Sequence, residues 1–160
     1  MKKVIILVLP LILLLSCKKA GEYALNENVS KEFLKQMNAL DDFEAKYFAD
    51  SSALAKAPST ETSIESQDAL KLSETSLKAV DNLRGKSISP EAMPFYIAAI
   101  KYIEEINAQG KIANDFFTET DPMMRRGYYE SVQENFKKLR NKPDSILEIQ
   151  KVYFEKVGLE

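Results

Sequence analysis

Histidine is absent from this 160-residue chain, and cysteine occurs once, at Cys17. Without histidine the chain lacks the commonest general base, the commonest pH switch near neutrality and the commonest transition-metal ligand. A single cysteine cannot form a disulfide bond within the chain, so packing must stabilise the fold. These absences argue against histidine-based catalysis and against most transition-metal sites.

Sequence patterns of histidine-free catalysis are also missing. The only S-x-x-K spacing, which could pair a serine nucleophile with a lysine base, joins Ser16 to Lys19. Neighbouring acids at 41–42 and 104–105 diverge by about 100° on a helix, so neither pair converges on one substrate. No run of acids alternates around a glycine as a calcium loop requires. We therefore expect no catalytic residue, no metal site and no cofactor.

The amino-terminal segment has the layout of a secretory signal peptide. Lys2 and Lys3 precede an apolar run over residues 4–15, broken only by Pro10, and the small residue Ser16 follows. A transmembrane helix needs about 20 predominantly apolar residues, and this run is shorter. We expect an export signal rather than a membrane-spanning helix.

Leu14-Leu15-Ser16-Cys17 resembles the lipobox of bacterial lipoproteins: an aliphatic residue, a permissive position, a small residue and then cysteine. The resemblance is confined to the first 19 residues. It implies that Cys17 receives a diacylglycerol, that the chain is cut before Cys17 and that the new amine is acylated. Two or three acyl chains, at ~0.8 kcal/mol per buried methylene, form a lasting membrane anchor. Lys18, rather than Asp, follows Cys17, which in this class favours the outer membrane.

This resemblance divides the chain into a signal peptide over residues 1–16 that is removed, the lipidated Cys17 with a tether to residue 28, and a bundle over residues 29–160. Residues 18–28 lack apolar periodicity, which predicts a short flexible tether. Removal of residues 1–16, which hold two lysines and no acid, would lower the formal net charge from −2 to −4. Overall acidity argues against nucleic acid as a partner.

Apolar spacing and capping signals after residue 28 predict helices, and no run with period two indicates a strand. The expected helices run from about Val29 to Lys56, from between Thr60 and Gln67 to Gly85, from Ser89-Pro90 or Met93 to Thr118, from Asp121-Pro122 to about Asn141, and from Asp144 or Ser145 to Gly158. Short loops favour antiparallel neighbours. We predict an all-α, antiparallel bundle of four to five helices.

Residues expected to face the core repeat at steps of three, four or seven along each helix. They are Phe33, Met37, Leu40, Tyr47, Leu54, Leu70, Leu77, Val80, Leu83, Ile97, Ile100, Ile103, Ile106, Ala113, Phe117, Met124, Tyr128, Val132, Phe136, Leu139, Ile146, Ile149, Val152, Tyr153 and Val157. Gly110 lies on the same face of its helix, and we expect another helix to pack closely against it.

Five side chains are candidates for partner binding: Arg125, Arg126, Tyr129, Lys137 and Lys138. Arginine and tyrosine are enriched at binding hot spots, and lysines near a helix end could face headgroups or an acidic partner. The alternative is that Met124 and Tyr128 lie in the core, the arginines pair with acids of a neighbouring helix, and the lysines complement the helix dipole.

The chain thus joins an export-and-anchor signal to a domain without histidine or a free thiol, and its mature part is similar to small helical lipoproteins of bacterial envelopes. We expect a protein anchored through the acyl chains on Cys17 that binds or scaffolds an envelope protein or polymer and is not an enzyme. Two alternatives stay open. One is a lipid-like ligand in a pocket lined by Phe33, Ile100, Phe117 and Phe136; the other is a hydrolase with two carboxylates in a cleft.

Overall fold

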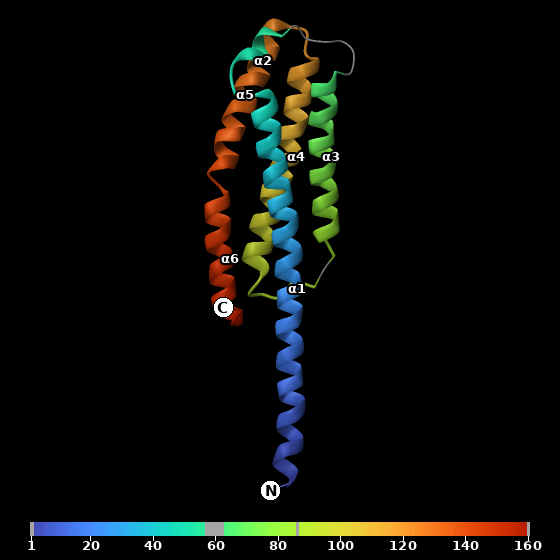
Figure 1. Cartoon of the computed structure of the whole chain (residues 1–160), viewed down its shortest axis with the longest axis vertical. Helices are drawn as coiled ribbons and strands as arrows, with labels where there is room; N and C mark the ends of the chain where they lie inside the picture. Colours follow the sequence, from blue (N-terminus) through green and yellow to red (C-terminus); the bar gives the residue numbers. More distant parts are fainter. Residues whose placement is uncertain (1, 57–62, 86, 160) are drawn as a thin grey trace.

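The structure is a computed structural model of the chain that describes residues 2–56, 63–85 and 87–159, with side chains from residue 19 onward. Its helices are α1 (Lys2–Tyr47), α2 (Ser52–Ala55), α3 (Ile64–Leu83), α4 (Met93–Thr118), α5 (Pro122–Arg140) and α6 (Pro143–Val157). None of the described residues forms a strand. Figure 1 shows that α1, α3, α4 and the α5–α6 pair alternate in direction. The predicted all-α antiparallel bundle is confirmed.

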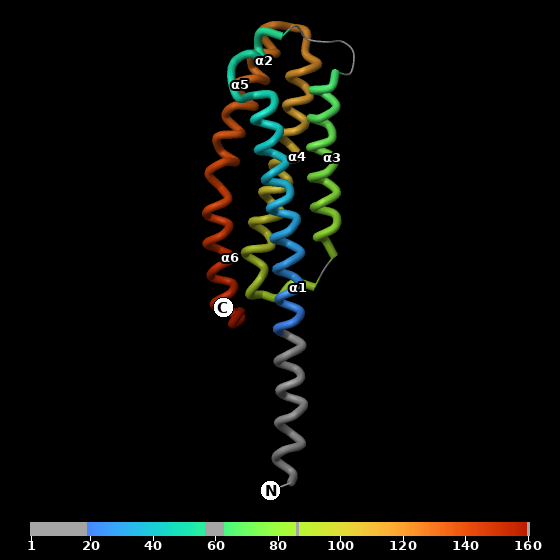
Figure 2. Tube along the Cα trace, in the orientation of Figure 1, coloured from blue at the N-terminus to red at the C-terminus, as the bar shows by residue number. Residues whose placement is uncertain are grey.

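Helix α4 is central, because it packs against α1, α3, α5 and α6. Helices α5 and α6 follow one another along one side of the bundle, with the break before Pro143 that the sequence predicts. We call the end formed by residues 19–26, residues 84–85 and 87–92 and the end of α6 the proximal end. The end formed by α2 and the starts of α3 and α5 is the distal end (Figure 2).

Three of the predicted capping signals, at Asp121, Gly85 and Gly158, act as expected. A carboxylate oxygen of Asp121 accepts hydrogen bonds from the backbone N–H groups of Met123 and Met124, at 2.9 Å each, as α5 begins at Pro122. Gly85 and Gly158 follow α3 and α6 with φ of 78° and 67°, values that favour glycine. These residues fix where the helices start and stop. The predicted start of the last helix at Asp144 or Ser145 is wrong, because α6 begins at Pro143 with Lys142 at its N-cap position and no side-chain cap.

The start of α1 differs from the prediction. Residues 19–28 are helical and continuous with the rest of α1, so the predicted flexible tether is wrong for them. The buried face of α1 runs through Leu25, Val29, Phe33, Leu40 and Phe43, together with Glu22 and Gln36. These two polar residues interrupt the apolar stripe and hide its period in the sequence.

The end of the first predicted helix also differs. Helix α1 stops at Tyr47 rather than Lys56, and α2 follows as a separate turn. The carboxylate of Asp50 accepts a hydrogen bond from the backbone N–H of Ser52 at 2.8 Å, which stabilises the turn between them. The turn directs Phe48 inward, where its ring lies 5.5 Å from the rings of Phe116, Phe117 and Phe136.

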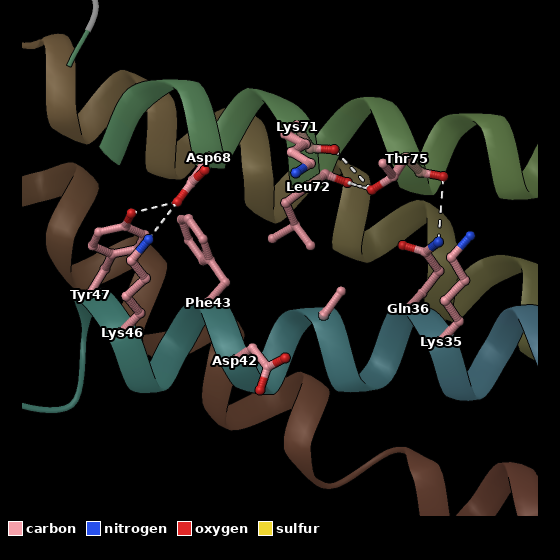
Figure 3. Close-up of a pocket in the computed structure, with 11 residues that line it drawn as sticks. Lys35, Gln36, Asp42, Phe43, Lys46, Tyr47, Asp68, Lys71, Leu72 and Thr75 are labelled. Atoms are coloured by element: carbon pink, nitrogen blue, oxygen red, sulfur yellow. Dashed lines mark hydrogen bonds and ion pairs between the residues drawn. The ribbon is translucent and has the colours of Figure 1, made fainter. Parts of the chain in front are cut away.

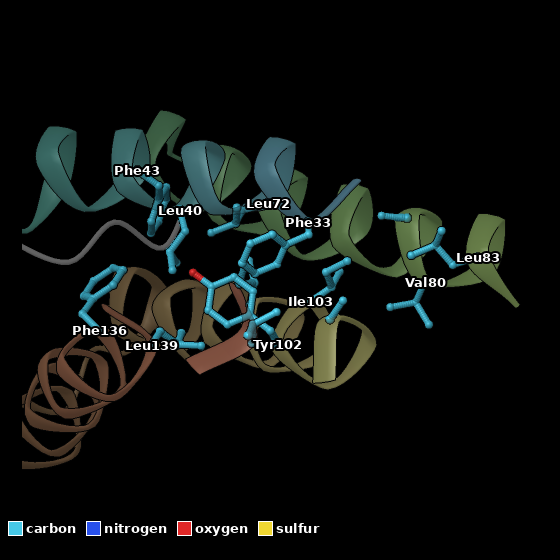
Figure 4. Packing of buried hydrophobic residues seen from close by; sticks show 14 of the residues in the cluster. Phe33, Leu40, Phe43, Leu72, Val80, Leu83, Tyr102, Ile103, Phe136 and Leu139 are labelled. Atoms are coloured by element: carbon cyan, nitrogen blue, oxygen red, sulfur yellow. The ribbon is translucent and has the colours of Figure 1, made fainter. Parts of the chain in front are cut away.

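The predicted core residues divide into two groups. Most are buried or partly buried, and Figure 4 shows Phe33, Leu40, Val80, Leu83, Ile103, Phe136 and Leu139 packed with Tyr102 between the helices. Five that we expected in the core are exposed: Leu70, Leu77, Ile97, Met124 and Val152.

The error on α3 has a clear cause. A Cβ atom added to Gly110 of α4 would lie 2.7 Å from the carbonyl oxygen of Ala69 and 2.8 Å from the backbone nitrogen of Ser73, so the predicted close packing at Gly110 is confirmed. Opposite Gly110 the inward face of α3 therefore carries the small residues Ala69 and Ser73, and Leu70 and Leu77 lie on the outward face of the same helix.

Candidate functional site

The candidate side chains from the sequence do not form one surface. Arg125 is buried; its guanidinium donates hydrogen bonds to the carbonyl oxygens of Ala53 (3.0 Å) and Leu54 (3.2 Å) and lies 4.7 Å from the centre of the Phe116 ring. It attaches α2 to α5 and is not free to bind a partner. The prediction of Arg125 as a partner-binding residue is therefore wrong.

The other four candidates are distributed along α5. Arg126 pairs with Glu130 and Lys138 with Glu134 on the same helix, Lys137 is exposed, and Tyr129 is partly buried against Phe48 and Phe116. The alternative with Met124 in the core is also wrong, since Met124 is 54% exposed. The contacts of Arg126, Tyr129 and Lys138 are therefore those of ordinary side chains on the surface of α5.

Cys17, the predicted lipidation site, has a side chain outside the described residues. Among the residues whose side chains the structure describes, which are 19–56, 63–85 and 87–159, no helix has both the length and the apolar character needed to cross a membrane.

The structure instead opens a hollow of about 340 Å³ between α1 and α3, along residues 35–47 and 68–75; we call it the α1–α3 hollow (Figure 3). Its floor is formed by Phe43 and Leu72, each 5% exposed, and by the partly buried Ala39. A side chain as small as that of Ala39 leaves space between the two helices.

Side-chain bridges join α1 to α3 at both ends of the hollow. At the distal side, Asp68 accepts hydrogen bonds from Lys46 (2.8 Å) and Tyr47 (2.6 Å). At the proximal side, the buried amide of Gln36 donates to the carbonyl oxygen of Thr75 (3.5 Å) and accepts from the hydroxyl of Ser76 (3.0 Å). The hollow is therefore bounded along the helix axes (Figure 3).

The hydrogen bonds at Asp68 influence the ionisation states of Asp68, Lys46 and Tyr47. Hydrogen bonds from Lys46 and then Tyr47 hold the pKa of Asp68 below its ordinary value, and the bond to Asp68 raises the pKa of Lys46. Burial, followed by the bond to Asp68, raises the pKa of Tyr47. Around neutral pH this bridge consists of a carboxylate, an ammonium group and a neutral phenol.

Three more charged residues stand at the rim: Lys35, Asp42 and Lys71. All three are exposed, and none has an ion-pair partner among the described residues, although Lys71 contributes to the lowered pKa of Asp68. Because Lys46 and Asp68 compensate each other, the rim carries one positive charge in excess.

The pocket expected for a lipid-like ligand has a different lining from this hollow. Phe33 contacts Tyr102, Phe117 contacts Tyr47 and Phe48, and Phe136 contacts Phe48, so these rings fill the core. Two carboxylates from different helices, Asp42 and Asp68, do line the hollow, but the pKa of Asp68 is lowered and not raised as the predicted hydrolase would need.

Sequence reasoning missed this site, although one signal was present. Lys35, Ala39, Asp42 and Lys46 recur at steps of three and four, which puts a small residue among charges on one face of α1. No protein-family model, curated protein or solved structure matches the chain.

Proposed function

We propose that this chain is a lipid-anchored protein of the bacterial cell envelope, held by acyl chains on Cys17, and that its bundle is a binding module without chemistry of its own. The amino-terminal lipobox supports the anchor, and the absence of Asp after Cys17 favours the outer membrane. The observation that carries the binding role is the α1–α3 hollow, an apolar floor held open between two bridges.

Binding fits this hollow better than catalysis does. A general acid or base needs a pKa near the working pH, whereas Asp68 is stabilised as a carboxylate by Lys46 and Tyr47. An apolar floor with a few polar groups at the rim is the usual construction of a small-molecule site. The hollow, near the lower end of the usual size range for such sites, accommodates a small ligand.

The anchor is tested by intact mass and membrane fractionation of the full chain, expressed in a bacterium that lipidates proteins. The wild type should begin at an acylated Cys17 and fractionate with membranes, whereas Cys17→Ala should lose both properties. Gly21→Ala is the matched control, because an added Cβ at Gly21 meets no atom within 4 Å. A wild-type mass without acyl groups would overturn the anchor.

A further inference from the structure

We propose that the α1–α3 hollow binds a single-chain anionic amphiphile, with its apolar chain on the Phe43–Leu72 floor and its head at Lys35 or Lys71. This inference rests on the proposed binding role of the hollow. It deepens that role by assigning the chemical class of the ligand.

The floor selects an apolar chain. Phe43 and Leu72 are almost fully buried, so the surface that they leave open lies at the bottom of the hollow, beside Ala39. Covering such surface with hydrocarbon removes it from water, which is favourable in proportion to the apolar area.

The bridges at the two ends limit the length of the occupant. A docked helix or a long peptide would extend past Tyr47–Asp68 or past Gln36–Thr75, where polar bridges replace the apolar floor. A short chain lies between the bridges without disturbing them. The occupant is therefore a small molecule rather than a protein segment.

The charges select an anionic head. Lys35 and Lys71 lie on opposite helices at the rim and lack ion-pair partners among the described residues, against one unpaired acid, Asp42. A carboxylate or phosphate head at either ammonium group forms a charge-assisted hydrogen bond.

The height of the hollow selects a ligand that leaves the bilayer. Lys19, two residues after the proposed anchor, donates to the carbonyl oxygen of Gly158 at the proximal end (3.2 Å), and Lys35 lies 16 residues further along the same helix. At 1.5 Å per residue that separation is about 24 Å. If the bundle stands on its proximal end, the acyl chains of lipids in the bilayer cannot reach the floor of the hollow. A single-chain amphiphile dissolves in water as a monomer and can reach it.

The test is photolabelling of the full chain in its membranes with dodecanoate that carries a diazirine on the chain, followed by peptide mapping. Labelling should concentrate in residues 35–47 and 68–75. Excess dodecanoate should compete, whereas dodecyltrimethylammonium and phosphatidylglycerol vesicles should not. Label spread evenly over the chain, or equal competition by the cation, would overturn the inference.

Two pairs of variants make the test specific. Ala39→Trp, which fills the hollow, should reduce labelling roughly tenfold, whereas Ala24→Trp, exposed elsewhere on α1, should not. The double variant Lys35→Glu and Lys71→Glu should reduce it about threefold, because exposed charges are partly screened, whereas Lys111→Glu with Lys137→Glu should have no effect. If Ala39→Trp does not fold, the comparison between the two lysine double variants still tests the proposal.

The same labelling applied to Cys17→Ala separates the two proposals. Labelled hollow residues in a chain released from the membrane support the ligand class, with or without acylation of the wild type. An acylated wild type whose labelling is unchanged by Ala39→Trp and by both lysine substitutions overturns the ligand class and leaves the anchor in place.

Discussion

Arg125 and Arg126 are neighbours in the sequence, but the helix directs them to different surroundings. Arg125 is 8% exposed and donates to two carbonyl oxygens at the end of α2, while Arg126 is exposed and pairs with Glu130 one turn away. A buried guanidinium that satisfies backbone carbonyls contributes to stability, whereas an exposed ion pair contributes little.

Arg125→Ala should lower the free energy of unfolding by about 2–3 kcal/mol, since it leaves two carbonyl groups without their donor and a void beside Phe116. Arg126→Ala should change it by less than about 0.5 kcal/mol. Urea unfolding followed by circular dichroism measures both. Equal effects would contradict the different roles assigned to these residues.

In the packing of the helices, substitution of two glycines by alanine should change the free energy of unfolding in opposite directions. Gly110→Ala places a Cβ within 3 Å of the backbone of α3, so it should separate α3 from α4 and lower the free energy of unfolding by about 1–3 kcal/mol. Gly127→Ala, in α5, meets no atom within 4 Å and should raise it by up to about 1 kcal/mol. Thermal unfolding of both variants checks the signs, and a stabilising Gly110→Ala would refute the close packing.

Some helix boundaries were predictable from local signals, although the start of α6 at Pro143 and the continuation of α1 through residues 28–30 were not. Asp121-Pro122 caps and starts α5, and Gly85 and Gly158 adopt the left-handed conformation, because these preferences belong to the residues themselves. Contacts between helices were not predictable in this way. The outward position of Leu70 depends on Gly110, which lies 40 positions further along the chain.

The candidate site shows the same limit. Glu22 and Gln36 are polar residues on a buried face, and each is explained only by partners on another element: Tyr153 and Ser89 for Glu22, Thr75 and Ser76 for Gln36. From the sequence alone we therefore predicted a tether where α1 continues. The spacing of Lys35, Ala39, Asp42 and Lys46 on α1 does not reveal that α3 lies opposite them, since that pairing depends on contacts between distant parts of the chain.

At the scale of the whole molecule, buried tyrosines link stability to alkaline pH. Burial raises the pKa of Tyr102 and of Tyr153 above the ordinary value of 10.0, with a further contribution at Tyr153 from its hydrogen bond to Glu22. Between the unfolded and folded pKa values, the unfolded chain loses these protons and the folded chain keeps them. The contribution of these two phenols to the free energy of unfolding is therefore fully present below about pH 10 and decreases as the pH rises above that value.

Urea unfolding midpoints measured from pH 8 to 12 should fall above about pH 10 and do so less steeply in Tyr153→Phe, which has one fewer buried phenol. Phenolate absorbance should show these buried tyrosines titrating together with unfolding. A midpoint that is independent of pH throughout this range would contradict the burial of these phenols.

The proximal end connects the proposed anchor to the bundle. The hydroxyl of Tyr153 donates to a carboxylate oxygen of Glu22 (2.8 Å), the hydroxyl of Ser89 donates to the same oxygen (3.1 Å), and Lys19 bonds to the carbonyl of Gly158. Lys19 lies two positions after Cys17, a reach of about 7 Å. An acylated Cys17 would therefore hold the bundle directly on the membrane, with the α1–α3 hollow at a fixed height above it.

Fluorescence quenching by headgroup-labelled lipids tests this claim most directly. Fluorophores are attached to Tyr23→Cys at the proximal end or Ile64→Cys at the distal end, both exposed positions, in the lipidated full chain on vesicles. We expect strong quenching at position 23 and little at position 64, which would lie roughly 40 Å further from the membrane along the bundle. A flexible Gly-Ser insertion between Lys18 and Lys19 should reduce the difference. Equal quenching at both positions without the insertion would contradict a bundle held upright at its anchor.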